Sequence, residues 1–271
     1  MISNIQKDRI LEYLKDGKRF DGRSPRDFRD IKVELGISKN AEGSCSLKIG
    51  KTEVFVGVKM GLSTPYPDNP DEGSLSTSME LGPMADDNFD LGPPKIGAIE
   101  MARVVDRGIR ESGFIDFKKL CIEEGEKVWQ ISLDIYAINN DGNLFDAASL
   151  ACLIALANAK IPVYNKEKGK VEHELSDVSL PVNKEALSFN LTFYRIGDQF
   201  VLDPTRDEEQ LASYRLAIAI GDNKGEARIT AMQKGEEGAI TQEEIEEVLN
   251  LVDEEYKKLY PKIEKLVWQN K

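Results

Sequence analysis

The stretch NDGNLFDAASLACLIALAN, residues 140–158, contributes most to the expected fold. Its first three residues, Asn-Asp-Gly, are typical of a tight turn, and hydrophobic alternation over residues 127–138 predicts a β-strand before that turn. After the turn, Asp146 is placed to cap an alanine-rich helix, and Pro162 lies beyond the helix end. Because alanine side chains are small, we expect this helix to approach a sheet or a partner helix closely.

Before this stretch, the sequence predicts a helix, a small sheet and a second helix. Apolar residues recur at helical spacing near the N-terminus until Gly17 ends the pattern. Residues 62–94 hold six prolines, and we interpret them as a long irregular loop around short extended pieces. Loops of this length are usually functional or mobile. The expected elements are a helix at 5–14, a β-meander of strands at 31–37, 44–49 and 52–60, and a helix at 96–111.

After the stretch, a charged segment at residues 166–174 marks the expected boundary between two packed subdomains. Thr241 and Glu244 form a capping box for a final long helix, which Pro261 is expected to kink or end. The expected strands lie at 187–195, 199–202, 213–220 and 227–233. The chain is therefore predicted to be an α+β protein, with an N-terminal helix at 1–18, a first subdomain at 19–165 and a second subdomain with the C-terminal helix at 166–271.

The composition narrows the possible functions. The three cysteines are far apart and form no CxxC pair, which argues against a disulfide framework and a zinc site. The charged N-terminus does not resemble a signal peptide, and no apolar run reaches the roughly 20 residues of a membrane helix. We therefore expect a cytoplasmic protein with no membrane partner. With His173 as the only histidine, His-dependent triads and multi-histidine metal sites are nearly excluded.

Charge and motif searches limit the chemistry further. A net charge of −12 weighs against non-specific coating of nucleic acid, because affinity for phosphates comes from Lys and Arg. Any RNA contact must therefore be local. The sequence has no P-loop, dinucleotide fingerprint, nucleophile elbow or HExxH motif. We expect no cofactor and no bound metal.

The segment IEMARVVDRGIRES, residues 99–112, carries the most informative charge pattern. At about 100° per residue, Arg103, Arg107 and Arg110 cluster on one face of the helix, nearly opposite an apolar face. A row of guanidinium groups can hold successive backbone phosphates, because each planar group fits phosphate oxygens with two hydrogen bonds. The alternative is a solvated face whose arginines pair with nearby acids; these are Glu100, Asp106 and Glu111.

Two other clusters leave their function open. The segment GKRFDGR, residues 17–23, is either a basic loop at an RNA or subunit surface or a turn with ordinary surface charge. The acids near residue 205 either bind Mg²⁺ or act as acid catalysts, or they form a polar turn after a strand. They are Asp203, Asp207, Glu208 and Glu209.

Four segments together resemble the RNase PH superfamily over most of the chain. They are GKRFDGR (17–23), AEGSCSLKIGKTEVFVGVK (41–59), EMARVVDRGIRES (100–112) and DGNLFDAASLACLIAL (141–156). Within it, EMARVVDRGIRESG with KLCIEEGEKVWQISLDIYAINNDGN is similar to the noncatalytic ring subunit of the archaeal exosome. The resemblance implies two packed βα units like the second domain of ribosomal protein S5. It also implies a heterodimer with a catalytic RNase PH-like subunit, and three heterodimers in a hexameric ring around an RNA channel.

The resemblance also bears on phosphorolysis, in which inorganic phosphate attacks the 3′-terminal linkage of RNA. Catalytic members carry a pair of arginines where this chain has Ile96 and Gly97, and a hydroxyl residue followed by arginine where it has Leu144 and Phe145. The phosphate pocket is therefore expected to be apolar. Of the catalytic acids, Asp203 is kept, and two further acidic positions fall on Glu209 and Arg215.

The leading hypothesis is a noncatalytic subunit that binds single-stranded RNA through Arg103, Arg107 and Arg110 and shapes the active site of its partner. For Arg110, pairing with an acid is the alternative. RNA-binding cap subunits are a further possible partner. One rival is a self-sufficient phosphorolytic exoribonuclease or nucleotidyltransferase, for which Asp203 and its neighbouring acids are the only positive evidence. Another is a structural assembly protein without RNA contact.

Overall fold

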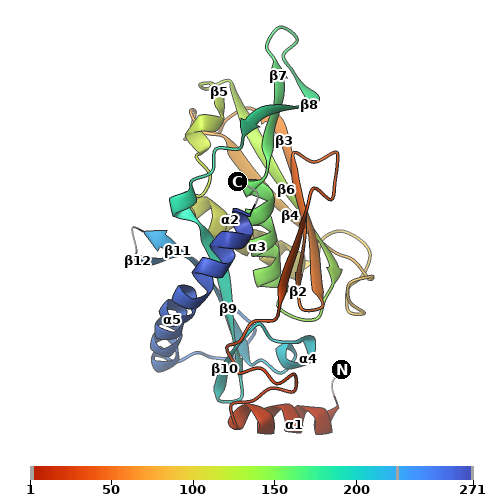
Figure 1. The fold of residues 1–271 in the computed structure, drawn as a ribbon, viewed down its shortest axis with the longest axis vertical. Helices are drawn as coiled ribbons and strands as arrows, with labels where there is room; N and C mark the ends of the chain where they lie inside the picture. The colour runs from red at the N-terminus through yellow and green to blue at the C-terminus, as the bar shows by residue number, and fades with distance from the viewer. Residues whose placement is uncertain (1–2, 224–225, 270–271) are drawn as a thin grey trace.

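The computed structural model describes residues 3–223 and 226–269, and two sheets organise them (Figure 1). In the larger sheet the strand order is β1-β2-β3-β6-β4, and the short strand β5 also pairs with β6. Strands β1 to β3 form the predicted antiparallel meander. The bounds are β1 (Ile31–Leu35), β2 (Gly43–Ile49), β3 (Thr52–Ser63), β4 (Ser74–Leu81), β5 (Cys121–Glu123) and β6 (Lys127–Asn139).

The smaller sheet is antiparallel throughout and has the order β10-β9-β11-β12. A separate hairpin of β7 and β8 projects at one end of the molecule, and helix α1 lies at the other (Figure 1). The bounds are β7 (Lys160–Asn165), β8 (Lys170–Ser179), β9 (Ser188–Ile196), β10 (Gln199–Leu202), β11 (Tyr214–Asn223) and β12 (Glu226–Gly235). The predicted subdomain boundary after residue 165 falls in the turn of the hairpin and stays a prediction.

Helices join the two sheets. The bounds are α1 (Asn4–Lys15), α2 (Ile96–Ser112), α3 (Leu144–Ala157), α4 (Arg206–Glu209) and α5 (Gln242–Val267), with 3₁₀ turns at Phe117–Leu120 and Lys184–Ala186. Every residue of α3 is buried. The helix packs on β2 and β3 of the larger sheet and on β9 of the smaller one. A Cβ added to Gly43 would lie 2.5 Å from the Ala155 carbonyl oxygen, so the predicted close approach of the alanine-rich helix is confirmed.

One hydrophobic core runs through both sheets, because buried residues of β3, α2, α3, β9 and α5 belong to a single cluster. A second, smaller cluster attaches α1 to the smaller sheet through Ile10 and Leu14, which pack on Tyr194, Ile196 and Val201. The predicted α+β fold of two packed βα units is therefore observed. None of the helices in the described residues is long and apolar enough to cross a bilayer.

Two local predictions were wrong. Asp146 does not cap α3: Asn143 precedes the helix in a left-handed conformation (φ 61°), and Asp146 lies in the first turn. Pro261 does not end α5, which continues to Val267, whereas the capping box of Thr241 and Glu244 is confirmed. One extended piece of the predicted loop at 62–94 is β4, which is parallel to β6. The charged segment at 166–174 leads into strand β8.

Candidate functional site

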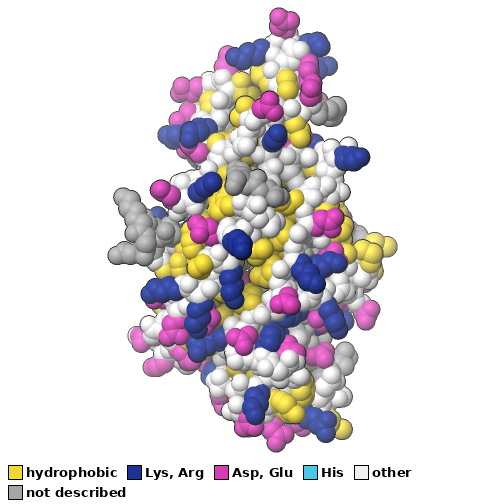
Figure 2. Space-filling model, viewed as in Figure 1, with side chains coloured by type: hydrophobic (Ala, Val, Ile, Leu, Met, Phe, Trp, Pro, Cys, Tyr) yellow, Lys and Arg dark blue, Asp and Glu magenta, His cyan; other side chains and the backbone are white. Residues whose placement is uncertain are grey.

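Helix α2 presents the two faces that its sequence predicted. Its apolar face, including Ala98, Ala102, Val105 and Ile109, is buried. On the other face Arg103 and Arg107 are exposed, and Arg110 is half-buried. On the face of the molecule drawn in Figure 2, acidic and basic side chains are interspersed. A surface of this kind does not attract a polyanion as a whole, so any contact with RNA must be local.

The three arginines differ in their partners. Within the described residues, Arg103 has no hydrogen bond or ion pair. Arg107 Nη1 lies 3.0 Å from Glu111 Oε1, an exposed pair of the kind that contributes little to stability. Arg110 donates to Asp106 at 3.1 Å and to the Leu75 carbonyl at 2.8 Å. The alternative of an ion pair is therefore observed for Arg107 and Arg110, although the Arg107 pair is exposed. Arg103 has no such partner among the described residues.

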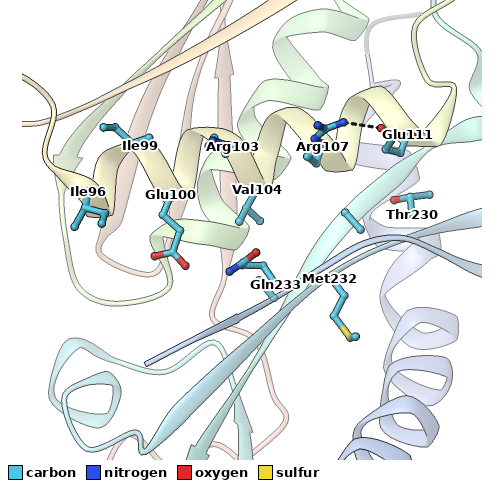
Figure 3. Close-up of a pocket in the computed structure, with 12 residues that line it drawn as sticks. Ile96, Ile99, Glu100, Arg103, Val104, Arg107, Glu111, Thr230, Met232 and Gln233 are labelled. Carbon is cyan, nitrogen blue, oxygen red and sulfur yellow. Dashed lines mark hydrogen bonds and ion pairs between the residues drawn. The ribbon is translucent and has the colours of Figure 1, made fainter. Parts of the chain in front are cut away.

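Two hollows flank this face of α2. The first, of about 540 Å³, lies between α2 and β12, where Glu100 and Val104 point toward Gln233 (Figure 3). The second, of about 400 Å³, brings all three arginines together; the other residues that line it are Tyr66, Thr77, Ala102 and Asp106. The predicted RNA-binding residues therefore share one surface depression.

The expected phosphate pocket is a hollow of about 220 Å³ that already contains a cation. The Arg215 guanidinium lies 4.1 Å from the centre of the Phe145 ring and donates to Glu100 Oε2 at 2.8 Å. On another side the guanidinium packs closely on Gly235: a Cβ atom built on this glycine would lie 2.2 Å from Arg215 Nη1. Leu144 and Phe145 are both buried, and only Phe145 lines the hollow. The expectation of an apolar pocket is wrong, because charged residues line it as well; besides Arg215 they are Glu100, Glu209 and Glu236. The only arginine lining the hollow is thus stacked on an aromatic ring and paired with an acid.

Glu209, one of the acids expected near this pocket, also lines the hollow. Its Oε1 accepts a hydrogen bond of 2.6 Å from the Tyr194 hydroxyl. Burial raises the pKa of Glu209 above its ordinary value, against the hydrogen bond from Tyr194, which lowers it. The carboxyl therefore holds Tyr194 in place inside the protein.

Asp203, the acid kept from the catalytic pattern, does not line that hollow. Its side chain is fully buried, and its oxygens lie 2.7 Å from Arg29 Nη2 and 3.0 Å from Arg23 Nη1. Asn143 Nδ2 also donates a hydrogen bond to this carboxylate, at 3.0 Å. Burial opposes the charge of Arg29, but the hydrogen bond and the charge of Asp203 outweigh it and raise the pKa of Arg29. Asp203 therefore joins the N-terminal segment to the turn before α3.

Of the basic segment at residues 17–23, Arg19 alone is buried, whereas Lys18, Phe20 and Asp21 are exposed. Arg19 is buried and binds both carboxylate oxygens of Glu208, with a 2.9 Å bond from its Nε, as well as the carbonyl oxygens of Leu202 and Asp203. The interpretation of an RNA or subunit surface is thus wrong for Arg19, and so is that of ordinary surface charge. No group of acids, cysteines or histidines in the described residues is placed to hold a metal ion.

Sequence reasoning missed two features of these sites. Tyr66 lines the arginine hollow, although the only local signal was its place between two prolines in a loop of functional length. Arg29, which binds Asp203 and the Asp141 and Gly142 carbonyls, had no signal at all. Its partners are more than 100 residues away along the chain.

Comparisons with known proteins identify the family. The model of domain 1 of the 3′ exoribonuclease family, RNase PH, matches residues 27–162, and that of domain 2 matches residues 190–251. The chain is a member of the RNase PH family. This RNase PH family member is 42% identical to the exosome complex component Rrp42 of Methanothermobacter thermautotrophicus, over 98% of the chain and 96% of that relative. It is 44% identical to the Rrp42 of Methanocella arvoryzae, over 97% of each.

Solved structures agree with this membership. The RNase PH family fold matches a chain of the Archaeoglobus fulgidus exosome with RNA bound to the active site. The TM-score is 0.86 at 39% identity, and the match covers 96% of this chain and 98% of that one. A chain of an archaeal exosome core matches with a TM-score of 0.81 at 37% identity, over 96% of each.

Proposed function

We propose that this chain is an exosome subunit that takes part in 3′-to-5′ RNA degradation by holding RNA, with no phosphorolytic site of its own. Similarity to Rrp42 proteins and to archaeal exosome chains over nearly the full length supports membership of such a complex. The partner is a catalytic RNase PH-like subunit, with which the chain forms heterodimers, three to a hexameric ring. The cytoplasmic location and the cap subunits stay predictions.

The proposal depends on the expected phosphate pocket, which the side chains of Phe145 and Arg215 line. Phosphorolysis needs inorganic phosphate to attack the terminal phosphodiester, so that a nucleoside diphosphate leaves and the shortened RNA keeps a 3′ hydroxyl. Charge-assisted contacts must hold the attacking anion. Here Phe145 lies where catalytic members have a cation, and Arg215 is already bound by Glu100. Asp203, the remaining acid, has both carboxylate oxygens bound by arginines.

The RNA-holding part of the proposal depends on the arginine face. Arg103 and Arg107 point to solvent from a rigid helix, and the acids near them leave at least Arg103 without a partner in the described part of the chain. Guanidinium groups retain their charge and hold phosphate oxygens with two hydrogen bonds. A subunit with this face positions the RNA 3′ end for the active site of its neighbour.

The test of missing catalysis is a phosphorolysis assay on the isolated chain with single-stranded RNA and inorganic phosphate. We expect no nucleoside diphosphate, whereas the complex co-purified from native cells releases it. Robust release by the isolated chain would contradict the proposal and favour the self-sufficient exoribonuclease.

The test of RNA holding uses the assembled complex with Arg103→Glu and Arg107→Glu combined. Reversal of two exposed charges is expected to weaken RNA binding steeply, because it adds repulsion where phosphates lie. Lys257→Glu on α5 changes an equally exposed cation away from this face and serves as the matched control. Unchanged RNA binding in the double variant would favour a structural assembly protein.

A further inference from the structure

The loop between β3 and β4 places one aromatic ring beside the arginine face. Tyr66 is 65% exposed, although tyrosine rings are usually at least half covered by protein. Together with Arg103, Arg107 and Arg110 it lines the hollow of about 400 Å³ on the outer side of α2. In the described residues, no aromatic ring or cation stacks on this side chain. The ring therefore does not serve the core.

The backbone around Tyr66 is held in place. Pro65 before it is buried, and Pro67 after it takes the second position of a β-turn in which Asn69 N donates to the Tyr66 carbonyl at 3.0 Å. Further along, the Pro70 carbonyl accepts a bond of 2.9 Å from Gly125 N. An exposed ring on a fixed backbone loses little conformational entropy when it binds a ligand.

The charges around the ring favour an anionic ligand. Among the residues that the structure describes, Asp106 is the only carboxylate that lines this hollow, and Arg110 and Thr77 bind it at 3.1 and 3.3 Å. Its charge is therefore neutralised within the protein. Arg103 and the exposed Arg107, whose partner Glu111 does not line this hollow, can then attract phosphate. Cationic groups for the backbone beside a flat ring for the bases are the combination by which proteins bind single-stranded nucleic acids.

We propose that Tyr66 stacks on a base of the single-stranded RNA whose phosphates Arg103 and Arg107 hold. This inference rests on the proposed function and adds a contact that is not electrostatic. Any base has a flat face, so the stacking tolerates all four bases and suits a protein that processes RNA of any sequence. Tyr66 is thus a positioning residue, which fixes the register of the strand beside the arginines.

The test measures RNA affinity of the assembled complex at several salt concentrations. Tyr66→Ala is expected to lower affinity by about fivefold or more at every salt concentration, the size of a lost base stack. Tyr66→Phe keeps the ring and is expected to retain wild-type affinity. Arg103→Ala, by contrast, removes a phosphate contact and is expected to reduce the slope of log affinity against log salt by about 0.7.

A second readout uses RNAs with a single abasic nucleotide at each position in turn. The wild-type complex should lose affinity at the position that Tyr66 covers, and the Tyr66→Ala complex should be insensitive at that same position. Affinity that is unchanged by Tyr66→Ala would overturn the stacking contact, while the Arg103→Ala effect leaves the proposed function standing. Disassembly of the Tyr66→Ala complex by mass would also overturn it, because the ring then contacts a protein partner. A wild-type complex that binds no RNA would refute both.

Discussion

Arg29 and Arg103 carry the same guanidinium group in opposite surroundings. Arg103 is exposed and has no acidic partner in the described structure, so its charge is available to a ligand. Arg29 is mostly buried, and Asp203 and three backbone carbonyls surround it. A buried charge is tolerated only when it is paired and hydrogen-bonded. Surroundings, rather than residue type, therefore separate the structural arginines from the candidate ligand-binding ones.

Arg29→Met is expected to lower the free energy of unfolding by about 3–5 kcal/mol, because it leaves the buried Asp203 carboxylate without its main partner. Urea denaturation monitored by circular dichroism measures the change. Lys257→Met on α5 is the control: Lys257 pairs with Asp253 at the surface, and its loss should change stability by at most about 1 kcal/mol. Equal effects of the two substitutions would contradict a structural role for the Arg29–Asp203 pair.

At the scale of elements, Asp146 ties α3 to β9. Its carboxylate accepts hydrogen bonds from the Thr192 backbone N at 3.2 Å and the Thr192 hydroxyl at 2.6 Å. The side chain is buried, and burial raises its pKa to about 7 despite the hydrogen bonds from Thr192. The first turn of the central helix thus holds a carboxyl that titrates near neutral pH.

The stability of the protein should therefore depend on Asp146 between about pH 4 and pH 7. In the unfolded chain an aspartate titrates near pH 3.9, roughly, so within this window the folded state binds more protons than the unfolded one. The free energy of unfolding then falls as the pH rises, with a slope of up to about 1.4 kcal/mol per pH unit. Asp146→Asn keeps groups that can bond to Thr192 and should remove that slope in urea titrations from pH 5 to pH 8.

The control for this experiment is Asp116→Asn. A hydrogen bond from Lys119 lowers the pKa of Asp116, so removal of this exposed carboxylate should leave the fall in stability at higher pH in place. If Asp146→Asn kept the wild-type slope, the raised pKa of Asp146 would be wrong.

At the scale of the whole molecule, the two sheets share one hydrophobic core. Helix α3 contacts both sheets, and α5 packs on α3 from the side of the smaller one. Neither half therefore has a core of its own apart from the small cluster under α1. Two sequence-defined halves that share a core are expected to unfold together.

The two tryptophans allow a direct test of this coupling. Trp129 lies in β6 of the larger sheet, and Trp268 follows α5, where its ring is 6.1 Å from that of Phe114. In Trp268→Phe the remaining Trp129 reports on the larger sheet, and in Trp129→Phe the remaining Trp268 reports on the contact between the C-terminal segment and Phe114. In each variant, the fluorescence transition should have the same midpoint as the circular dichroism transition of that variant. Separate midpoints within one variant would show that the halves unfold independently.

Much of the element order could be predicted from local patterns. Alternation and helical spacing placed the meander, α2, β6, α3 and the strands of the smaller sheet within a few residues of their observed bounds. Strand β4 was not placed, although Leu75, Met79 and Leu81 alternate with polar residues, because the prolines on both sides of it indicated an irregular loop. Parallel pairing with β6 stabilises the strand. Helix α5 does not end at Pro261, because helix packing on the core outweighs the local cost of proline.

What the sequence determined by itself was therefore the faces of elements and the residue types at the candidate sites: the arginine row on α2, and Leu144 and Phe145 at the start of α3. Only the tertiary structure decided which charges meet. Arg19 pairs with Glu208 and Arg29 with Asp203 across separations of 189 and 174 residues, and Tyr66 comes to lie beside Arg103. The physical reason is that spacing along a chain reports which side of an element is buried, whereas partners across a core are brought together only by packing.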